Sequence, residues 1–217
     1  MQFMKLYYGS QTLFEKPIYG FGNTSNDYGL GFYLTDSPSL AELWACQYEQ
    51  GGYVLDFSLN LSGLSILELS ENDEISILKW ITLLVKHRFS YQERLNYLEI
   101  IDWLERHFDT PINDFDIIIG YRADDSYFHY SHGFVAGLIS IETLAKAMKL
   151  GKLGLQYVLI SKNAFNKIEF SGYHVVSHKN DYTEFREKIL DEYHQLLNQE
   201  DRFNNTFIGE LMKKYGR

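Results

Sequence analysis

The spacing of apolar and polar positions changes along this chain between a period of two and a period near 3.6. Short runs rich in β-branched and aromatic residues, bounded by glycine or by polar clusters, are typical of strands. Runs of this kind occupy 3–10, 29–35, 52–59, 115–120, 154–161 and 173–177. The run at 115–120 is apolar without alternation, which predicts a strand that is buried on both faces.

Longer stretches carry apolar residues every three or four positions, which predicts helices with one buried face. They occupy 38–50, 70–88, 90–108, 140–150, 181–198 and 207–212. Asp36 or Ser37 is placed to cap the first of these helices. Ser90 and Glu93 match a capping box at the start of the third. The two helices within 70–109 therefore form a hairpin inserted between strands.

Residues 11–30 show no sustained period and are rich in Gly, Asn, Asp and Ser. Such a segment is a long loop, and loops of this length inside a compact domain often carry function. The chain shows no internal repeat, low-complexity tract or linker. We therefore predict one α+β domain that extends over residues 1–217.

Composition argues against several classes of protein but does not indicate a particular reaction. The formal net charge is −9, which argues against sequence-independent binding to phosphate backbones. Cys46 is the single cysteine, so no internal disulfide is possible, and we predict a buried residue on the first helix. No segment has the pattern of a signal peptide or of a membrane span, so we expect a cytoplasmic protein and no membrane partner.

The segment 27–35 combines two glycines with an aromatic pair and leads directly into a helix. Gly29 and Gly31 allow a positive φ or the close approach of another group. In a strand, Phe32 and Tyr33 point to opposite faces, so that one ring enters a core while the other faces a cleft. On this pattern alone, a plain core strand is an equally good interpretation.

Histidines and carboxylates gather between residues 124 and 132. His129 and His132 are three apart, which suits a helix but divides the imidazoles between the two faces of a strand. No second histidine or cysteine cluster accompanies them, so we expect no metal site. Asp124 and Asp125 are most simply part of a solvated turn.

Three separated motifs are more specific when they are taken together. They are Leu6-Tyr7-Tyr8-Gly9-Ser10, then Asp27-Tyr28-Gly29-Leu30-Gly31-Phe32-Tyr33-Leu34-Thr35 followed by Ala41 and Ala45, and then Leu155-Gln156-Tyr157-Val158-Leu159. This set resembles a bacterial family of unnamed function with Leu-Tyr-His-Gly-Ser and Gly-Phe-Tyr-Leu-Thr motifs. That family is similar to the ADP-ribosyltransferase superfamily, on the branch with a His–Tyr–Glu triad. The resemblance covers most of residues 4–170 and implies a split β-sheet core with the helical hairpin inserted.

The resemblance also implies roles for single residues. In enzymes of that branch, the histidine and the glycine after it hold the nicotinamide ribose and carboxamide, and the tyrosine stacks on the nicotinamide ring. The glutamate binds a ribose hydroxyl and stabilises the oxocarbenium ion. These roles fall on Tyr8 and Gly9, on Tyr33, and on Gln156. Tyr8 still donates a hydrogen bond, whereas the neutral amide of Gln156 cannot offset a developing positive charge.

Further residues of the same region complete the expected NAD site. Ser10 belongs to the first motif, and Asn23 lies in the loop that is expected to meet the phosphates. Arg122 is the nearest obvious cation. Asp124 or Asp125 is a candidate for the carboxylate that Gln156 does not supply.

The expectation is therefore a NAD-dependent mono-ADP-ribosyltransferase-like protein, with NAD as substrate. Its acceptor is a macromolecule, either a protein or a specifically docked nucleic acid. Related transferases imply a bacterial or phage toxin, with a possible antitoxin as partner. Two alternatives stay open. One is a catalytically inactive NAD-fold binding module that contacts a partner protein, and the other is a NAD glycohydrolase.

Overall fold

The computed structural model describes residues 3–46, 51–123, 125–150, 154–177 and 181–216, with backbone alone for 125–128 and 181–186. Its centre is a seven-stranded sheet in the order β4-β5-β6-β2-β1-β3-β7. The β4–β5 pair is parallel, and the other neighbouring pairs are antiparallel. The strands are β1 (Phe3–Ser10), β2 (Phe32–Thr35), β3 (Gly52–Asn60), β4 (Ile66–Glu68), β5 (Ile117–Gly120), β6 (Gln156–Leu159) and β7 (Ile168–Val176).

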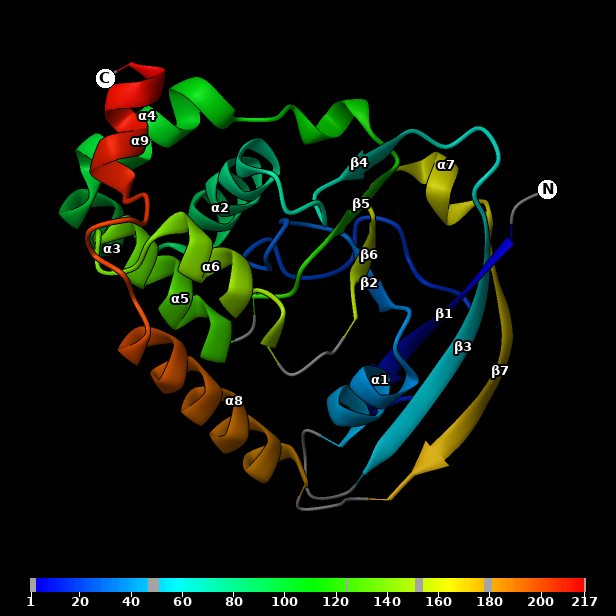
Figure 1. Cartoon of the computed structure of the whole chain (residues 1–217). Coiled ribbons are helices and arrows are strands. Elements are labelled where there is room, and N and C mark those ends of the chain that lie inside the picture. Colours follow the sequence, from blue (N-terminus) through cyan, green and yellow to red (C-terminus); the bar gives the residue numbers. More distant parts are fainter. Residues whose placement is uncertain (1–2, 47–50, 124, 151–153, 178–180, 217) are drawn as a thin grey trace.

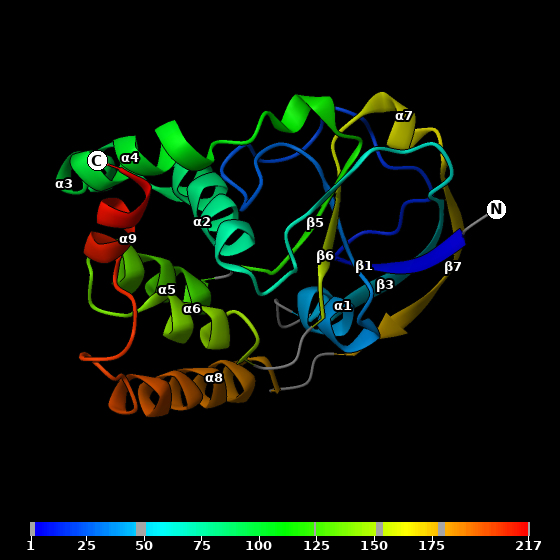
Figure 2. The ribbon, with the colours of Figure 1, turned by 45° about the horizontal axis from the view of Figure 1, so that its top comes forward.

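Most of the helices gather on one side of the β5–β6 half of the sheet, while β1, β3 and β7 form the opposite end of the molecule (Figure 1). The turned view keeps α2, α5, α6, α8 and α9 together on that side (Figure 2). The helices are α1 (Pro38–Ala45), α2 (Glu74–Arg88), α3 (Tyr91–Asn96), α4 (Leu98–Phe108), a 3₁₀ turn (Ile112–Asp114), α5 (Asp125–Val135), α6 (Ile141–Ala147), α7 (Lys162–Phe165), α8 (Asp181–Asn198) and α9 (Ile208–Tyr215). The architecture is α+β, as predicted.

The sheet is almost divided between β1 and β2. These neighbours share one residue pair, Tyr7 with Thr35, whereas β1 pairs with β3 at eight positions and β2 pairs with β6 at four. Beyond the Tyr7–Thr35 pair, the end of β1 follows β3 and the start of β2 follows β6. An opening therefore forms between the two halves of the sheet.

Helix α1 packs closely on β1 because β1 has glycine at the crossing point. A Cβ atom at Gly9 would overlap the carbonyl oxygen of Ala41 and would lie 2.6 Å from Cβ of Trp44 and 2.7 Å from N of Ala45. The small residues Ala41 and Ala45 are themselves fully buried. Glycine at position 9 thus allows the helix to lie directly on the strand.

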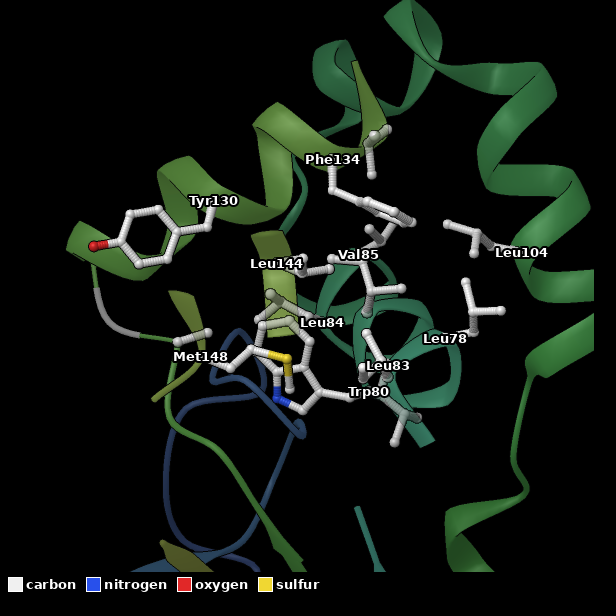
Figure 3. Close-up of a cluster of buried hydrophobic side chains, with 14 of the residues drawn as sticks. Leu78, Trp80, Leu83, Leu84, Val85, Leu104, Tyr130, Phe134, Leu144 and Met148 are labelled. Atoms are coloured by element: carbon white, nitrogen blue, oxygen red, sulfur yellow. The ribbon is translucent and has the colours of Figure 1, made fainter. Parts of the chain in front are cut away.

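The larger core lies between the helices and one face of the sheet. Figure 3 shows side chains of α2, α4, α5 and α6 meeting at its centre. Trp80 is buried there, and its indole N–H donates to the carbonyl of Tyr121 at the end of β5. The opposite face of the sheet carries a second cluster, which joins residues of both halves, such as Leu6 and Phe57 with Tyr157.

The inserted hairpin ends where it was expected to end, but its first helix begins at Glu74 rather than at residue 70, and its second helix is interrupted. Ser90 and Glu93 form the predicted capping box, yet the helix stops at Tyr97 and restarts as α4. The chain turns at this point because α4 buries one face, with Ile101, Trp103 and Leu104, while α3 buries none of its residues. Both segments are helical, as predicted, but burial of one face of α4 in the core sets the direction of that helix.

Two predictions of local structure were wrong, and both errors concern elements held by tertiary contacts. Asp124 lies outside the described residues, and Asp125, which we expected in a solvated turn, is the first residue of α5, the helix that includes His129 and His132. The last strand begins at Ile168 rather than near 173, because β7 pairs with β3 along its length. The prediction for Cys46 is confirmed, since its thiol is buried at the end of α1.

In the described ranges, no helix combines the length and the apolar character that crossing a membrane requires.

Candidate functional site

A cleft of about 690 Å³ opens at the division of the sheet. Its walls come from the end of β1, the start of β2, the loop that joins them, the ends of α1 and α2, the segment after β5, and the start of β6. It brings together seven of the predicted site residues: Tyr8, Gly9, Ser10, Asn23, Tyr33, Arg122 and Gln156. A volume of this size accommodates a ligand as large as a nucleotide.

Tyr33 and Gln156 lie on one face of the sheet and close to each other. Tyr33 pairs with Val158 and Thr35 pairs with Gln156 across β2 and β6, and directly paired residues of antiparallel strands share a face. The two residues are therefore diagonal neighbours, which can interact through long side chains. The sequence places them 123 positions apart, and the ladder brings them to the same wall.

The ring of Tyr33 is held by two hydrogen bonds at its hydroxyl. The hydroxyl donates to the carbonyl of Gly29 at 2.7 Å and accepts from the backbone N–H of Tyr28 at 3.0 Å. Burial raises the pKa of Tyr33, and the nearby Asp27 carboxylate acts in the same direction. The phenol therefore stays neutral, and its ring is fixed in orientation before any ligand arrives.

Gln156 contributes a buried polar atom with no partner in the described part of the chain. The residue is 5% exposed, and its Oε1 atom has no hydrogen bond. Buried amide oxygens are normally paired, because an unpaired one loses its hydration without compensation. A ligand group that donates a hydrogen bond to this oxygen would remove that penalty.

Tyr8 reaches the cleft from the other face of the sheet. Its ring packs against Phe14 and Phe32, with ring centroids 5.5 Å and 4.9 Å away. Burial raises the pKa of Tyr8, so its hydroxyl is a neutral group. Tyr8 therefore lines the cleft as part of an aromatic wall, rather than beside Tyr33 and Gln156 on one face.

The remaining motif residues have structural contacts of their own. Gly9 allows α1 to approach β1, and this packing brings Trp44 to the cleft. Ser10 accepts from the backbone N–H of Thr12 at 3.1 Å. Asn23 accepts from Ser25 N–H at 2.9 Å, which closes a turn in the loop. These contacts set the shape of the cleft without excluding a bound ligand.

Arg122 is a buried cation in the cleft wall. Its guanidinium carbon lies 5.7 Å from the ring centroid of Trp44, a distance at which a cation and an aromatic ring attract each other. Of the two carboxylates proposed for this wall, Asp124 lies outside the described residues. Asp125 is the first residue of α5, and the structure describes its backbone alone.

Sequence reasoning missed an ion pair that joins the loop to the helical insertion. Asp27 is buried, accepts from Nη1 of Arg88 at 2.9 Å, and accepts from the backbone N–H of Ala123 at 2.8 Å. Both Asp27 and Arg88 line the cleft. Arg88 is the last residue of α2, and no local pattern marks its contact with a residue 61 positions away.

The described part of the cleft is locally positive although the chain is acidic. Lys16, Arg88 and Arg122 line it, and Asp27 is the one carboxylate among the described lining residues. Cations gathered in a cleft favour an anionic ligand, because the low-dielectric walls reduce the screening of their charges. Among the described residues there is no group of three or more His, Cys, Asp or Glu side chains suited to a metal ion.

Comparison with known proteins places the chain in a family. A family model described as "Protein of unknown function (DUF3990)" matches residues 4–170, and the chain belongs to this family. Neither the curated proteins nor the solved structures that were compared gave a match to the chain. The matched residues include β1, the loop, β2, α1, the helical insertion and β6, which together build the cleft.

Proposed function

We propose that this protein binds NAD in the cleft and transfers ADP-ribose to a macromolecule, as a mono-ADP-ribosyltransferase-like protein of the His–Tyr–Glu branch. The observation that carries the proposal is the meeting of Tyr33, Gln156 and Arg122 at one opening in the sheet. The near-division between β1 and β2 is what a split-sheet core requires. Three motifs that are distant in sequence thus contribute to a single cavity.

The proposed pose places each part of NAD against matching chemistry. The nicotinamide ring stacks on Tyr33, whose orientation is already set by its two hydrogen bonds. The pyrophosphate lies toward Arg122 and Arg88, which supply positive charge in a partly buried setting. A ribose hydroxyl donates to the unpaired Oε1 atom of Gln156.

The reaction needs little covalent help from the protein. The bond between the nicotinamide nitrogen and the ribose carbon breaks, and nicotinamide leaves as a neutral molecule with the bonding electrons. The acceptor nucleophile then attacks the ribose carbon and loses a proton. Clamping and ring stacking position the reacting bond, and this part of catalysis depends on geometry that the cleft already has.

Gln156 sets the expected efficiency of the reaction. A carboxylate stabilises the positive charge that develops on the ribose as nicotinamide leaves, whereas a neutral amide supplies a hydrogen bond only. We therefore expect the protein to bind NAD but to cleave it slowly. The same residue supports the second candidate, a catalytically inactive NAD-binding module that contacts a partner protein.

The rim of the cleft supports a macromolecular acceptor. Ile18 and Phe21 line the cleft, yet they are 69% and 76% exposed. Large apolar side chains left open to water at a cleft mouth are typical of a surface that contacts another molecule. We therefore favour a macromolecular acceptor of ADP-ribose, either a protein or a nucleic acid docked specifically at this rim, over water. The cytoplasmic toxin context and an antitoxin partner remain part of this proposal.

One experiment separates the three functions. The protein is incubated with NAD labelled in its adenylate portion and with a bacterial lysate, and macromolecular label and free nicotinamide are measured together. Label on a macromolecule with matching nicotinamide supports the transferase. Nicotinamide without label indicates the glycohydrolase, and saturable NAD binding without either product indicates the binding module. Absence of NAD binding would refute the whole assignment.

A further inference from the structure

Strand β7 forms one edge of the sheet, and in the described part of the chain no strand pairs with its outer side (Figure 1). It is nine residues long and contains no proline. An edge of this length presents a row of unpaired backbone N–H and C=O groups, which is a template for a further strand. Proteins usually protect such an edge from pairing with other chains. The side chains and the backbone geometry of β7 therefore indicate whether it is protected or is available for pairing.

A β-bulge divides β7 into two halves. The ladder with β3 moves from Phe57 paired with Phe170 to Asp56 paired with Gly172, so Ser171 is an extra residue. The extra residue shifts the alternation of side chains by one position. Residues 168, 170, 173 and 175 therefore share one face, with Leu55 and Phe57 of β3, and residues 169, 172, 174 and 176 share the other.

A bulge normally protects an edge, because a regular strand that pairs with it falls out of step with the side-chain alternation. A second copy of β7 carries the same extra residue. In an antiparallel pair whose two-fold axis passes between Ser171 and Gly172, the two bulges face each other. Side chains on both sides of the bulge then stay in register.

We propose that β7 pairs in this way with β7 of a second copy of the chain, which extends the sheet across a symmetric dimer. In this register Phe170 faces Tyr173 of the second copy, and Glu169 faces His174 of the second copy. Ile168 faces Val175 of the second copy in the same ladder. Each of these pairs occurs twice, as a symmetric interface requires.

The paired residues are chemically complementary. Glu169 and His174 are exposed and lie on the same face, so each carboxylate meets an imidazole that donates a hydrogen bond to it. His174 Nε2 lies 3.6 Å from Glu42 Oε1, which is too long for a hydrogen bond and leaves the imidazole able to turn.

The apolar face favours a second copy over water. Tyr173 and Val175 are 51% and 69% exposed, an unusual state for apolar residues in a strand. Aromatic and β-branched residues paired across strands stabilise a sheet. The Phe170–Tyr173 and Ile168–Val175 pairs would cover these exposed side chains in both copies. The interface is separate from the cleft, because β3 and β1 lie between β7 and the division of the sheet.

A cross-linking experiment tests the register. Directly opposed residues of antiparallel strands have Cα atoms about 4.5–5.5 Å apart, which is within the range for a disulfide. The full-length double variant E169C/H174C should form a covalent dimer on mild oxidation. The single variants E169C and H174C are matched controls, because each has the same exposed thiol without a thiol opposite to it. Equal cross-linking in single and double variants, or none in the double variant, would overturn the proposal.

A second measurement does not depend on disulfide geometry. Light scattering of the wild-type protein in the micromolar range should give twice the chain mass of 25.5 kDa. Glu169→Lys should weaken the dimer about tenfold or more, because an ammonium group cannot accept the imidazole N–H and both cross-strand hydrogen bonds are lost; adding His174→Glu should restore it, because each Lys then faces a carboxylate. A monomeric wild-type mass would reject the second copy as occupant. Unchanged NAD binding in these variants would keep this result independent of the proposed function.

Discussion

The hydroxyl group of Tyr33 donates a 2.7 Å hydrogen bond to the carbonyl of Gly29, four residues earlier in the chain. Gly29 has a φ of 78°, a conformation that favours glycine, and a Cβ atom there would lie 2.6 Å from the His87 ring. The loop before β2 thus folds back on the aromatic ring of the same motif. This contact couples the loop, the ring and the helical insertion around one side of the cleft.

Two substitutions at Tyr33 test separately the contribution of its aromatic ring and that of the hydrogen bonds of its hydroxyl group. Tyr33→Phe removes two hydrogen bonds and should lower the free energy of unfolding by about 1–3 kcal/mol, while NAD affinity falls only a few fold. Tyr33→Ala also removes the stacking surface, and NAD affinity should fall roughly tenfold to a hundredfold. Calorimetric titration with NAD measures the two affinities, and urea unfolding measures the change in stability. Wild-type affinity in the Ala variant would remove Tyr33 from the site.

Gln156→Glu tests the charge argument. A carboxylate at this position should stabilise the developing positive charge and raise the rate of nicotinamide release by about tenfold or more. Gln156→Ala is the matched control, since it removes the amide without adding charge and should not raise the rate. Single-turnover release of nicotinamide is the measurement. An unchanged rate in the Glu variant, with NAD still bound, would favour the binding module.

Gly9→Ala tests the packing of α1 on β1. The added methyl group overlaps the carbonyl of Ala41, so we expect a loss of about 1–3 kcal/mol or more in the free energy of unfolding. Gly209→Ala in α9 is the control, because the added Cβ has no atom within 4 Å apart from its chain neighbours and the backbone of its own helix. In a helix, Ala is favoured over Gly by about 0.5–1 kcal/mol, so this variant should be stabilised. Urea unfolding of both variants gives the comparison, and equal effects would contradict the packing argument.

Asp116 predicts a loss of stability in acid. Burial acts to raise the pKa of Asp116, but hydrogen bonds from Ser161, Ser65 and Asn163 outweigh it, and the pKa lies below the usual 3.8. A lowered folded-state pKa stabilises the fold above pH 3.8, and this contribution is lost as the pH falls through the folded-state value. Asp116→Asn should therefore flatten the dependence of unfolding free energy on pH below this value.

The control for this prediction is a neighbouring carboxylate. Asp114 is exposed, and its side chain lies outside the hydrogen-bond cluster around Asp116. Asp114→Asn should leave the acid branch of the stability curve unchanged. A similar flattening in both variants would assign the effect to net charge rather than to the cluster.

Local sequence was sufficient for much of the fold. The strand that ends at Ser10, the cap at Ser90 and the cap at Ser37, one of the two residues predicted for it, appear as predicted, because each depends on residues close together in the chain. The strand predicted over 29–35 is shorter and covers Phe32–Thr35. Helix α5 escaped prediction because its polar start at Asp125 resembles a turn. Its buried residues Tyr130 and Phe134 form a helical face only when α2 and α6 pack against it.

For the candidate site, the sequence by itself determined the kinds of residue and the three motifs that carry them. Tertiary structure alone decided which of them meet. The single Tyr7–Thr35 pair opens the sheet, the β2–β6 register sets Gln156 beside Tyr33, and Asp27 draws Arg88 from the helical insertion to the same wall. The physical reason is that strand register and long-range ion pairs depend on residues far apart in the chain, and no local period encodes them.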